Sequence, residues 1–232
     1  MRAMWGGGAA FAGAALALYG SVAGLSVHCE RVEATAHRGY SRAAPENTLS
    51  AFRKAVEVGA DYAELDVQRT ADSALVILHD SDLMRLTKTS KGIHELTLAE
   101  VRRFDVGSHF DPAFAGERIP TLAEVIALAR GKIKLNIELK FHGKDRRLAA
   151  DVACLLREED FEDQCVVTSL NYDGLVEVKR HNPRLQTGVI VAVALGESAG
   201  WTWTCSVWTR SSVPSGCCAR RGGTASRCTS GQ

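Results

Sequence analysis

Short apolar runs alternate with amphipathic segments along most of this 232-residue chain. The apolar runs are bounded by turn residues and predict six strands, at residues 33–37, 62–67, 75–79, 133–139, 165–169 and 188–193. Between the first two strands, Leu49, Phe52 and Val56 recur at the spacing of a helix. We expect Asn47 to cap this helix and Gly59 to end it. Strands separated by helices predict a parallel sheet in an α/β fold.

The segment 81–120 is too long for an ordinary connection, so we expect it to leave the main layer. After it, Thr121 and Glu124 match the capping box that begins a helix, which should reach about Arg130. Polar residues gather at the carboxyl ends of the predicted strands, as active residues do in TIM barrels. The chain is therefore predicted to be α/β, an incomplete TIM-type (β/α)8 barrel with about six recognisable strands.

The first part of the chain has a different pattern, because residues 5–27 contain no charged side chain. About 20 apolar residues in a helix can span the hydrocarbon core of a bilayer. A secretory signal peptide is the alternative, but Arg2 is its only basic residue and the apolar stretch is long for that purpose. We therefore expect an N-terminal membrane-spanning helix at residues 1–30, and a membrane location as a single pass or as the last helix of a larger membrane region. Flanking basic residues do not fix its orientation.

The last part of the chain also differs in composition. From Glu197 onward it holds three of the four tryptophans and four of the seven cysteines, and it lacks lysine. The codons for Trp-Thr-Trp-Thr at 201–204, read one base earlier, encode an alternation of an apolar residue and Asp, which suits a barrel strand. We therefore hypothesise a frameshift, with a divergent tail as the alternative. The predicted parts are an anchor at 1–30, a partial barrel domain at 31–196 and an aberrant tail at 197–232.

Overall charge narrows the range of ligands. Twenty-eight basic and 27 acidic residues give a formal charge of +1, and no basic run with interleaved aromatic residues occurs. Nucleic acid is therefore not an expected partner. Cysteine spacing matches neither a disulfide framework nor a zinc site. An anionic substrate would have to be met by a local site.

Paired charges within the apolar strands supply such a site. Side chains two positions apart on a strand share one face, so Glu64 and Asp66 should point together, as should Glu138 and Lys140. Three carboxylates can bind one hard divalent cation, Ca²⁺ or Mg²⁺. Surface salt bridges are the alternative, but buried charges in apolar strands need compensation. We predict a metal site formed by Glu64, Asp66 and Glu138.

Two histidines, His37 and His79, each end one of the apolar runs. Two imidazoles beside a phosphate can act as general acid and general base at neutral pH. Arg38 suits bidentate contact with phosphate oxygens, and Lys140 can add a point charge. We expect Gly39 to let the backbone pass close to a ligand.

Five short motifs follow one another in a fixed order: His37-Arg38-Gly39, Pro45-Glu46-Asn47-Thr48, Glu64-Leu65-Asp66-Val67, Leu78-His79-Asp80 and Ile137-Glu138-Leu139-Lys140. With these motifs the chain resembles the glycerophosphodiester phosphodiesterase family, from about Thr35 to about Gly196. It is most similar to bacterial members whose catalytic domain follows a membrane region.

The resemblance implies a (β/α)8 barrel with a small insertion after the third strand, and metal-dependent hydrolysis of a glycerophosphodiester to glycerol 3-phosphate and an alcohol. It implies that His37 and His79 are catalytic. Arg38 and Lys140 would bind the substrate phosphate, and the three carboxylates would bind the cation.

The chain departs from the family after residue 196, where two more strands should follow. An unclosed barrel exposes strand edges, so we expect a poorly stable product with weak or no activity. Two alternative functions stay open: a related barrel of the lysophospholipase D type, and a non-catalytic membrane-tethered remnant. The sequence does not predict the alcohol group or the oligomeric state.

Overall fold

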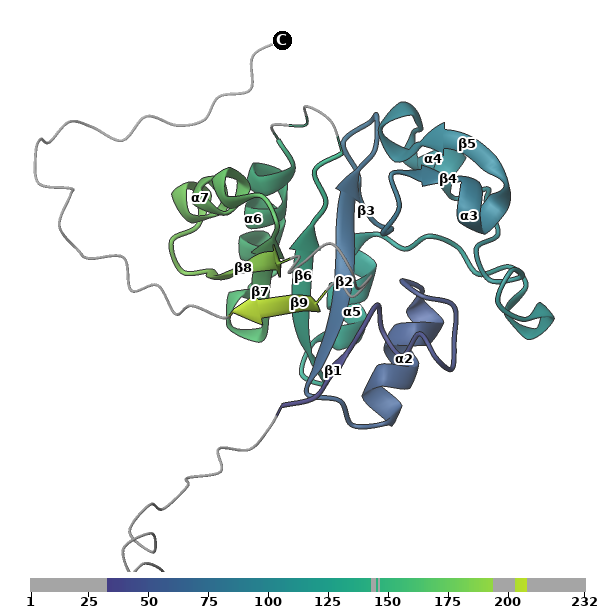
Figure 1. Ribbon diagram of the computed structural model, residues 1–232, viewed down its shortest axis with the longest axis horizontal. Coiled ribbons are helices and arrows are strands. Elements are labelled where there is room, and N and C mark those ends of the chain that lie inside the picture. Colours follow the sequence, from purple (N-terminus) through teal and green to yellow (C-terminus); the bar gives the residue numbers. More distant parts are fainter. Residues whose placement is uncertain (1–32, 143–144, 146, 194–202, 208–232) are drawn as a thin grey trace, which may run out of the picture. The chain divides into compact units, whose positions relative to one another are not determined.

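The computed structural model describes residues 33–142, 145, 147–193 and 203–207. Its main sheet has a parallel part whose strands follow the order β1 (Thr35–Ala36), β2 (Tyr62–Arg69), β6 (Lys134–Leu139), β7 (Cys165–Ser169) and β8 (Gln186–Val193). Each of these strands runs parallel to its neighbour in that order. The sheet curls and corresponds to part of a barrel (Figure 1). The predicted α/β class and TIM-barrel-like architecture are confirmed for this part.

Four helices connect the parallel strands: α2 (Leu49–Glu57), α5 (Leu122–Ala129), α6 (Leu148–Glu158) and α7 (Tyr172–His181). The Thr121 capping box is present, because Thr121 Oγ1 accepts a hydrogen bond from Glu124 N and the Glu124 carboxylate accepts one from Thr121 N. The large apolar core lies between these helices and the sheet, and Phe52, Ile126 and Leu156 are buried in it. This core fixes the positions of the strand ends.

The third predicted strand differs from the expectation in its direction and in its place in the sheet. β3 (Leu75–Ile77) pairs antiparallel with β2 and lies off the main path of the sheet. The connection between the two strands is residues 70–74 alone, whereas a parallel pair needs a crossover of about a dozen residues or more. The expectation of a third parallel barrel strand at 75–79 is therefore wrong.

The start of α2 also corrects the prediction. Thr48, not Asn47, is the cap, because its side-chain oxygen accepts a hydrogen bond from Ala51 N at 3.3 Å. Asn47 has a φ of +56° and lies just outside the helix. Gly59 follows the helix with a φ of +71°, as expected of a glycine stop.

The predicted excursion after residue 80 forms short elements: β4 (Asp82–Leu83), α3 (Met84–Thr87), β5 (Thr89–Gly92), η1 (Ile93–Glu95), α4 (Leu98–Val101) and η2 (Pro112–Phe114). They have a small core of their own, which includes Leu83, Ile93 and Ile119. β4 and β5 form a separate two-stranded antiparallel sheet. The excursion, here called the inserted segment (residues 81–120), is therefore anchored by its own buried side chains.

A further strand, β9 (Trp203–Val207), pairs antiparallel with β8. It lies within residues 197–232, which were predicted to be an aberrant tail. The connecting residues, 194–202, are again too few for a parallel crossover, so β9 is not the next strand of a regular (β/α)8 barrel. The division of the chain at residue 196 stays a prediction.

The predicted membrane-spanning helix falls on residues 1–30, which lie outside the described residues. Within the part that the structure describes, no helix is long and apolar enough to cross a membrane. The longest helix there is α6, with 11 residues, whereas a span needs about 20. The predicted membrane localisation is contradicted by this finding and is withdrawn, and the predicted tethering to a membrane has no support among the described residues.

Candidate active site and cation site

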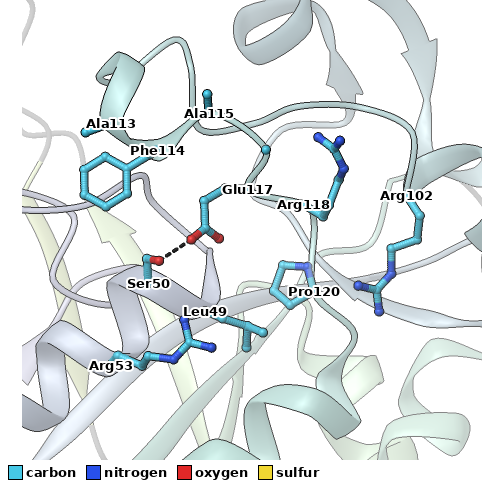
Figure 2. A pocket seen from close by; sticks show the side chains of 11 residues that line it. Leu49, Ser50, Arg53, Arg102, Ala113, Phe114, Ala115, Glu117, Arg118 and Pro120 are labelled. Atoms are coloured by element: carbon cyan, nitrogen blue, oxygen red, sulfur yellow. Dashed lines mark hydrogen bonds between the residues drawn. The ribbon is translucent and has the colours of Figure 1, made fainter.

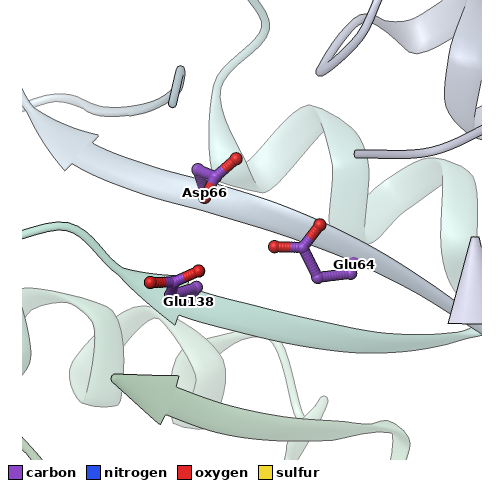
Figure 3. Close-up of side chains that lie close together, drawn as sticks. All are labelled: Glu64, Asp66 and Glu138. Carbon is purple, nitrogen blue, oxygen red and sulfur yellow. The ribbon is translucent and has the colours of Figure 1, made fainter. Parts of the chain in front are cut away.

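β2 and β6 bring three carboxylates together at the carboxyl ends of the sheet (Figure 3). Asp66 pairs in register with Glu138, and Glu64 lies two residues before Asp66 on the same face. One ligand oxygen from each of the three residues lies within 4.8 Å of the others. The residues are only 7%, 1% and 9% exposed for Glu64, Asp66 and Glu138, so the cluster is buried.

Burial makes the negative charges of this cluster costly. The pKa of Glu64 is raised from 4.5 to about 8, first by burial and then by the charge of Asp66, with a smaller contribution from Glu138. A hydrogen bond from Arg38 N to Glu64 Oε2, 2.8 Å long, opposes this rise. The cluster therefore favours a positive partner, either a proton or a metal cation.

Two cationic side chains compensate part of this charge. Lys140 Nζ lies 2.7 Å from Glu138 Oε1 and 3.2 Å from Asp66 Oδ1. Burial opposes the charge on Lys140, but its hydrogen bond to Glu138 and the charge of Asp66 leave the pKa of the ammonium group raised. Arg38 Nε lies 3.6 Å from Asp66 Oδ2. Both predicted phosphate-binding residues therefore lie beside the predicted metal ligands.

The donor set fits a hard divalent cation. Ca²⁺ and Mg²⁺ prefer carboxylate and amide oxygens. Among the described residues, Asp66 Oδ1 and Asn47 Oδ1 are buried and accept no hydrogen bond of good geometry. Both oxygens are available to a cation, because Asn47 Oδ1 is left without a hydrogen-bond donor and Asp66 Oδ1 has only its ion pair with Lys140.

Asn47 is a site residue that the strand-end argument missed. Its Nδ2 donates to Asp66 Oδ2 at 2.9 Å, and its backbone N donates to Arg38 O at 2.9 Å. Arg38 and Asn47 both have positive φ values, +53° and +56°, which non-glycine residues rarely adopt. Asn tolerates this conformation better than most residues. The position of Asn47, directly before the Thr48 cap, is the sequence signal that could have identified it as a site residue.

The two histidines lie beside this cluster. His37 Nε2 is 3.8 Å from Glu64 Oε2. Partial burial of the ring lowers the pKa of His37, and the charge of Arg38 lowers it further. The backbone N of Leu78 donates to Asp66 O at 2.9 Å, which places the following residue, His79, next to the end of β2.

His79 has a fixed orientation. Its Nδ1 lies 2.8 Å from Asp80 Oδ1. An ionised carboxylate only accepts hydrogen bonds, so Nδ1 carries the proton and Nε2 is left for other partners. Asp80 thus orients the His79 ring. His142 contacts the backbone oxygen of His79 through Nε2 at 3.4 Å.

The structure explains the glycine at position 39 by close packing, whereas we expected from the sequence that a nearby ligand would require it. A Cβ on Gly39 would lie 2.8 Å from the carbonyl carbon and from the Cβ of Ala51 in α2. Its φ of +72° also disfavours other residues. The glycine is therefore required by close packing of the loop against α2.

A separate pocket of about 500 Å³ lies between α2 and residues 113–120 (Figure 2). Arg53, Arg102 and Arg118 line it, and Ser50 donates a hydrogen bond to Glu117 across it. None of the residues predicted for catalysis, phosphate binding or metal binding lines this pocket. We therefore place the candidate site at the carboxylate cluster.

Comparison with known proteins gives consistent matches. The model of the Glycerophosphoryl diester phosphodiesterase family matches residues 37–209. A glycerophosphodiester phosphodiesterase of Caldanaerobacter subterraneus is 40% identical over 168 residues, covering 70% of this chain and 68% of the relative. Neither alternative function predicted from the sequence is favoured by these matches.

Solved structures agree with this result. A phosphodiesterase of Oleispira antarctica, in complex with the product sn-glycerol-3-phosphate, is 34% identical with a TM-score of 0.65, covering 68% of this chain and 65% of that one. A glycerophosphodiester phosphodiesterase of Agrobacterium tumefaciens is 31% identical with a TM-score of 0.62, covering 68% and 66%. The chain thus spans about two thirds of the length of its relatives.

Proposed function

The chain belongs to the glycerophosphoryl diester phosphodiesterase family, and on that basis we propose that it hydrolyses glycerophosphodiesters to glycerol 3-phosphate and an alcohol with the help of a divalent cation. The observation that carries the proposal is the buried cluster of Glu64, Asp66 and Glu138 beside two histidines and two cationic side chains. The product bound to the relative from Oleispira antarctica supports the same substrate class.

Each group has a distinct role in the proposed reaction. Glu64, Asp66 and Glu138 would hold Ca²⁺ or Mg²⁺, which as a Lewis acid stabilises the charge that develops on a phosphoryl oxygen. Arg38 and Lys140 would bind the remaining phosphate oxygens. His37 and His79 would move the two protons, one taken from the attacking hydroxyl group and one given to the leaving alcohol.

Phosphodiester turnover tests this proposal. The purified chain, checked for folding by circular dichroism, is given glycerophosphocholine with Ca²⁺ or Mg²⁺ or with a chelator, and release of glycerol 3-phosphate is measured. We expect weak release that depends on the cation and falls by at least about a hundredfold in Asp66→Asn, because a metal ligand is lost. Lysophosphatidylcholine serves as the competing substrate.

Two results would contradict the proposal. One is a folded chain that releases no glycerol 3-phosphate with either cation. The other is an Asp66→Asn variant as active as the unchanged chain. Faster turnover of lysophosphatidylcholine than of glycerophosphocholine would instead favour the lysophospholipase D type of activity.

A further inference from the structure

We propose that Arg85, in the inserted segment, is a positioning residue that holds His79 and Arg38 in place through two intervening carboxylates. The inference rests on the proposed function of the carboxylate cluster. It adds a residue that lies outside all five sequence motifs, and it gives the inserted segment a part in the active site.

The first branch of the network leads to His79. Arg85 Nε lies 2.6 Å from Asp80 Oδ2. The other oxygen of the same carboxylate, Oδ1, lies 2.8 Å from His79 Nδ1. Both oxygens of Asp80 are thus engaged, one by the guanidinium group and one by the imidazole. Rotation of the carboxylate would break one contact or the other, so Arg85 fixes the group that orients the ring.

The second branch leads to Arg38. Arg85 Nη2 lies 2.5 Å from Glu46 Oε1. The same oxygen lies 3.0 Å from Arg38 Nη1. Arg38 in turn approaches Asp66 through Nε at 3.6 Å. Glu46 therefore joins two guanidinium groups, one from the inserted segment and one from the phosphate-binding loop.

The chemistry of arginine suits this arrangement. A guanidinium group presents several donors in one rigid plane, so Nε and Nη2 can serve two carboxylates at fixed directions. A lysine has one flexible nitrogen and cannot reproduce both directions together. Buried neighbours on either side fix the backbone, since Leu83 is fully buried and Leu86 is 7% exposed in the core of the inserted segment.

Exposure of Arg85 argues against a role in stability alone. Its side chain is 46% exposed, and an exposed ion pair contributes little to the free energy of folding. Both of its acceptors, however, touch residues of the candidate site. The contacts therefore matter for the geometry of His79 and Arg38 more than for the fold.

The tautomer of His79 is the direct readout, and it does not depend on turnover. In the unchanged chain, ¹⁵N NMR of the imidazoles well above their ordinary pKa of about 6.5 should show His79 with its proton on Nδ1. The His79 signals are assigned by their absence from His79→Gln. In Arg85→Gln we expect a mixture with the Nε2-protonated form, because Asp80 is free to turn away.

Kinetics supply a second readout wherever the unchanged chain is active. Arg85→Gln should lower kcat/KM for glycerophosphocholine by on the order of tenfold, mainly through kcat, because small misplacements of catalytic groups are costly. Arg85→Lys, which can contact one carboxylate at a time, should recover part of the activity and part of the Nδ1 tautomer. If Arg85→Gln does not fold, Arg85→Lys is used in its place for both measurements.

Arg102→Gln is the matched control. Arg102 is also an arginine of the inserted segment and pairs with Glu124 at 2.5 Å, but neither partner touches the candidate site. It should leave both readouts unchanged. The proposal is overturned if His79 keeps the Nδ1 tautomer in Arg85→Gln, or if Arg102→Gln shifts the tautomer equally. An inactive unchanged chain would count against the proposed function alone, and the NMR result would still decide on Arg85.

Discussion

Glu64 shows at the scale of one residue how burial creates the need for a cation. Its neighbours in the cluster are Asp66 and Glu138, which are as buried as Glu64 itself. Sequence alone could predict these three residues, because alternation on a strand places charges on one face. This alternation did not identify Asn47 or Arg85, whose contacts with the site depend on a loop conformation and on an inserted segment. Arg85 lies 39 residues from Glu46.

The raised pKa of Glu64 predicts how stability changes with pH. The folded, metal-free chain binds a proton at Glu64 more tightly than the unfolded chain, since the pKa rises from 4.5 to about 8. The stabilisation that this group contributes is present below the lower value and is lost as the pH rises through the higher one. A bound cation removes the need for the proton.

Scanning calorimetry with a chelator, and then with Ca²⁺ or Mg²⁺, checks this expectation. The cation should raise Tm more at the upper end of the pH range than at the lower end. Glu64→Gln, which has no titrating carboxyl group at this position, should show a weaker pH dependence of Tm than the unchanged metal-free chain. An equal cation effect at both ends of the range would contradict the account.

Helices and strands were predicted best where the residues within or next to them in the sequence determine them. The capping box of Thr121 and Glu124 predicts α5, and the apolar runs predict β2, β6 and β7. The direction of β3 was predicted wrongly, because strand direction depends on the length of the preceding connection and not on the strand's own residues. The cap of α2 was misplaced by one residue, because Asn47 and Thr48 are both suitable caps.

Gly39, in the loop that carries Arg38, and Gly59, just after α2, together test how closely this helix packs against that loop. Gly39 and Gly59 have nearly equal φ values of +72° and +71°, but only at Gly39 would a Cβ meet other atoms within 4 Å. Gly59→Ala should cost about 1 kcal/mol, for the left-handed conformation alone. Gly39→Ala should cost about 1–3 kcal/mol more, because the new methyl group is forced against Ala51.

Urea unfolding of the two variants measures this difference, with the unchanged chain as reference. Equal free energies of unfolding for Gly39→Ala and Gly59→Ala would mean that the loop can move away from α2. That result would contradict the close packing inferred for Gly39.

At the scale of the molecule, the main sheet of the described residues ends at each side in a strand that is paired along only one edge. Within the described residues, β1 pairs only with β2, and β9 pairs only with β8. Unpaired strand edges invite association with other chains. We therefore expect the chain to associate through these edges.

Added charge on one edge tests this expectation. Thr35→Lys places a charge on the exposed edge residue of β1 and should lower light scattering at a given concentration. Ala71→Lys adds the same charge in an exposed turn and should have little effect. Equal scattering by the two variants would indicate that the edge of β1 is not where the chains associate.

Calorimetric titration of Ca²⁺ and of Mg²⁺ into the metal-free chain is the most direct test of the carboxylate cluster. We expect one cation per chain, with binding weakened at least about tenfold in Glu138→Gln because one of three ligands is lost. Glu177→Gln, a change at an exposed ion pair on α7, should bind as the unchanged chain does. A folded chain that binds neither cation, or a Glu138→Gln variant that binds them equally well, would contradict the account.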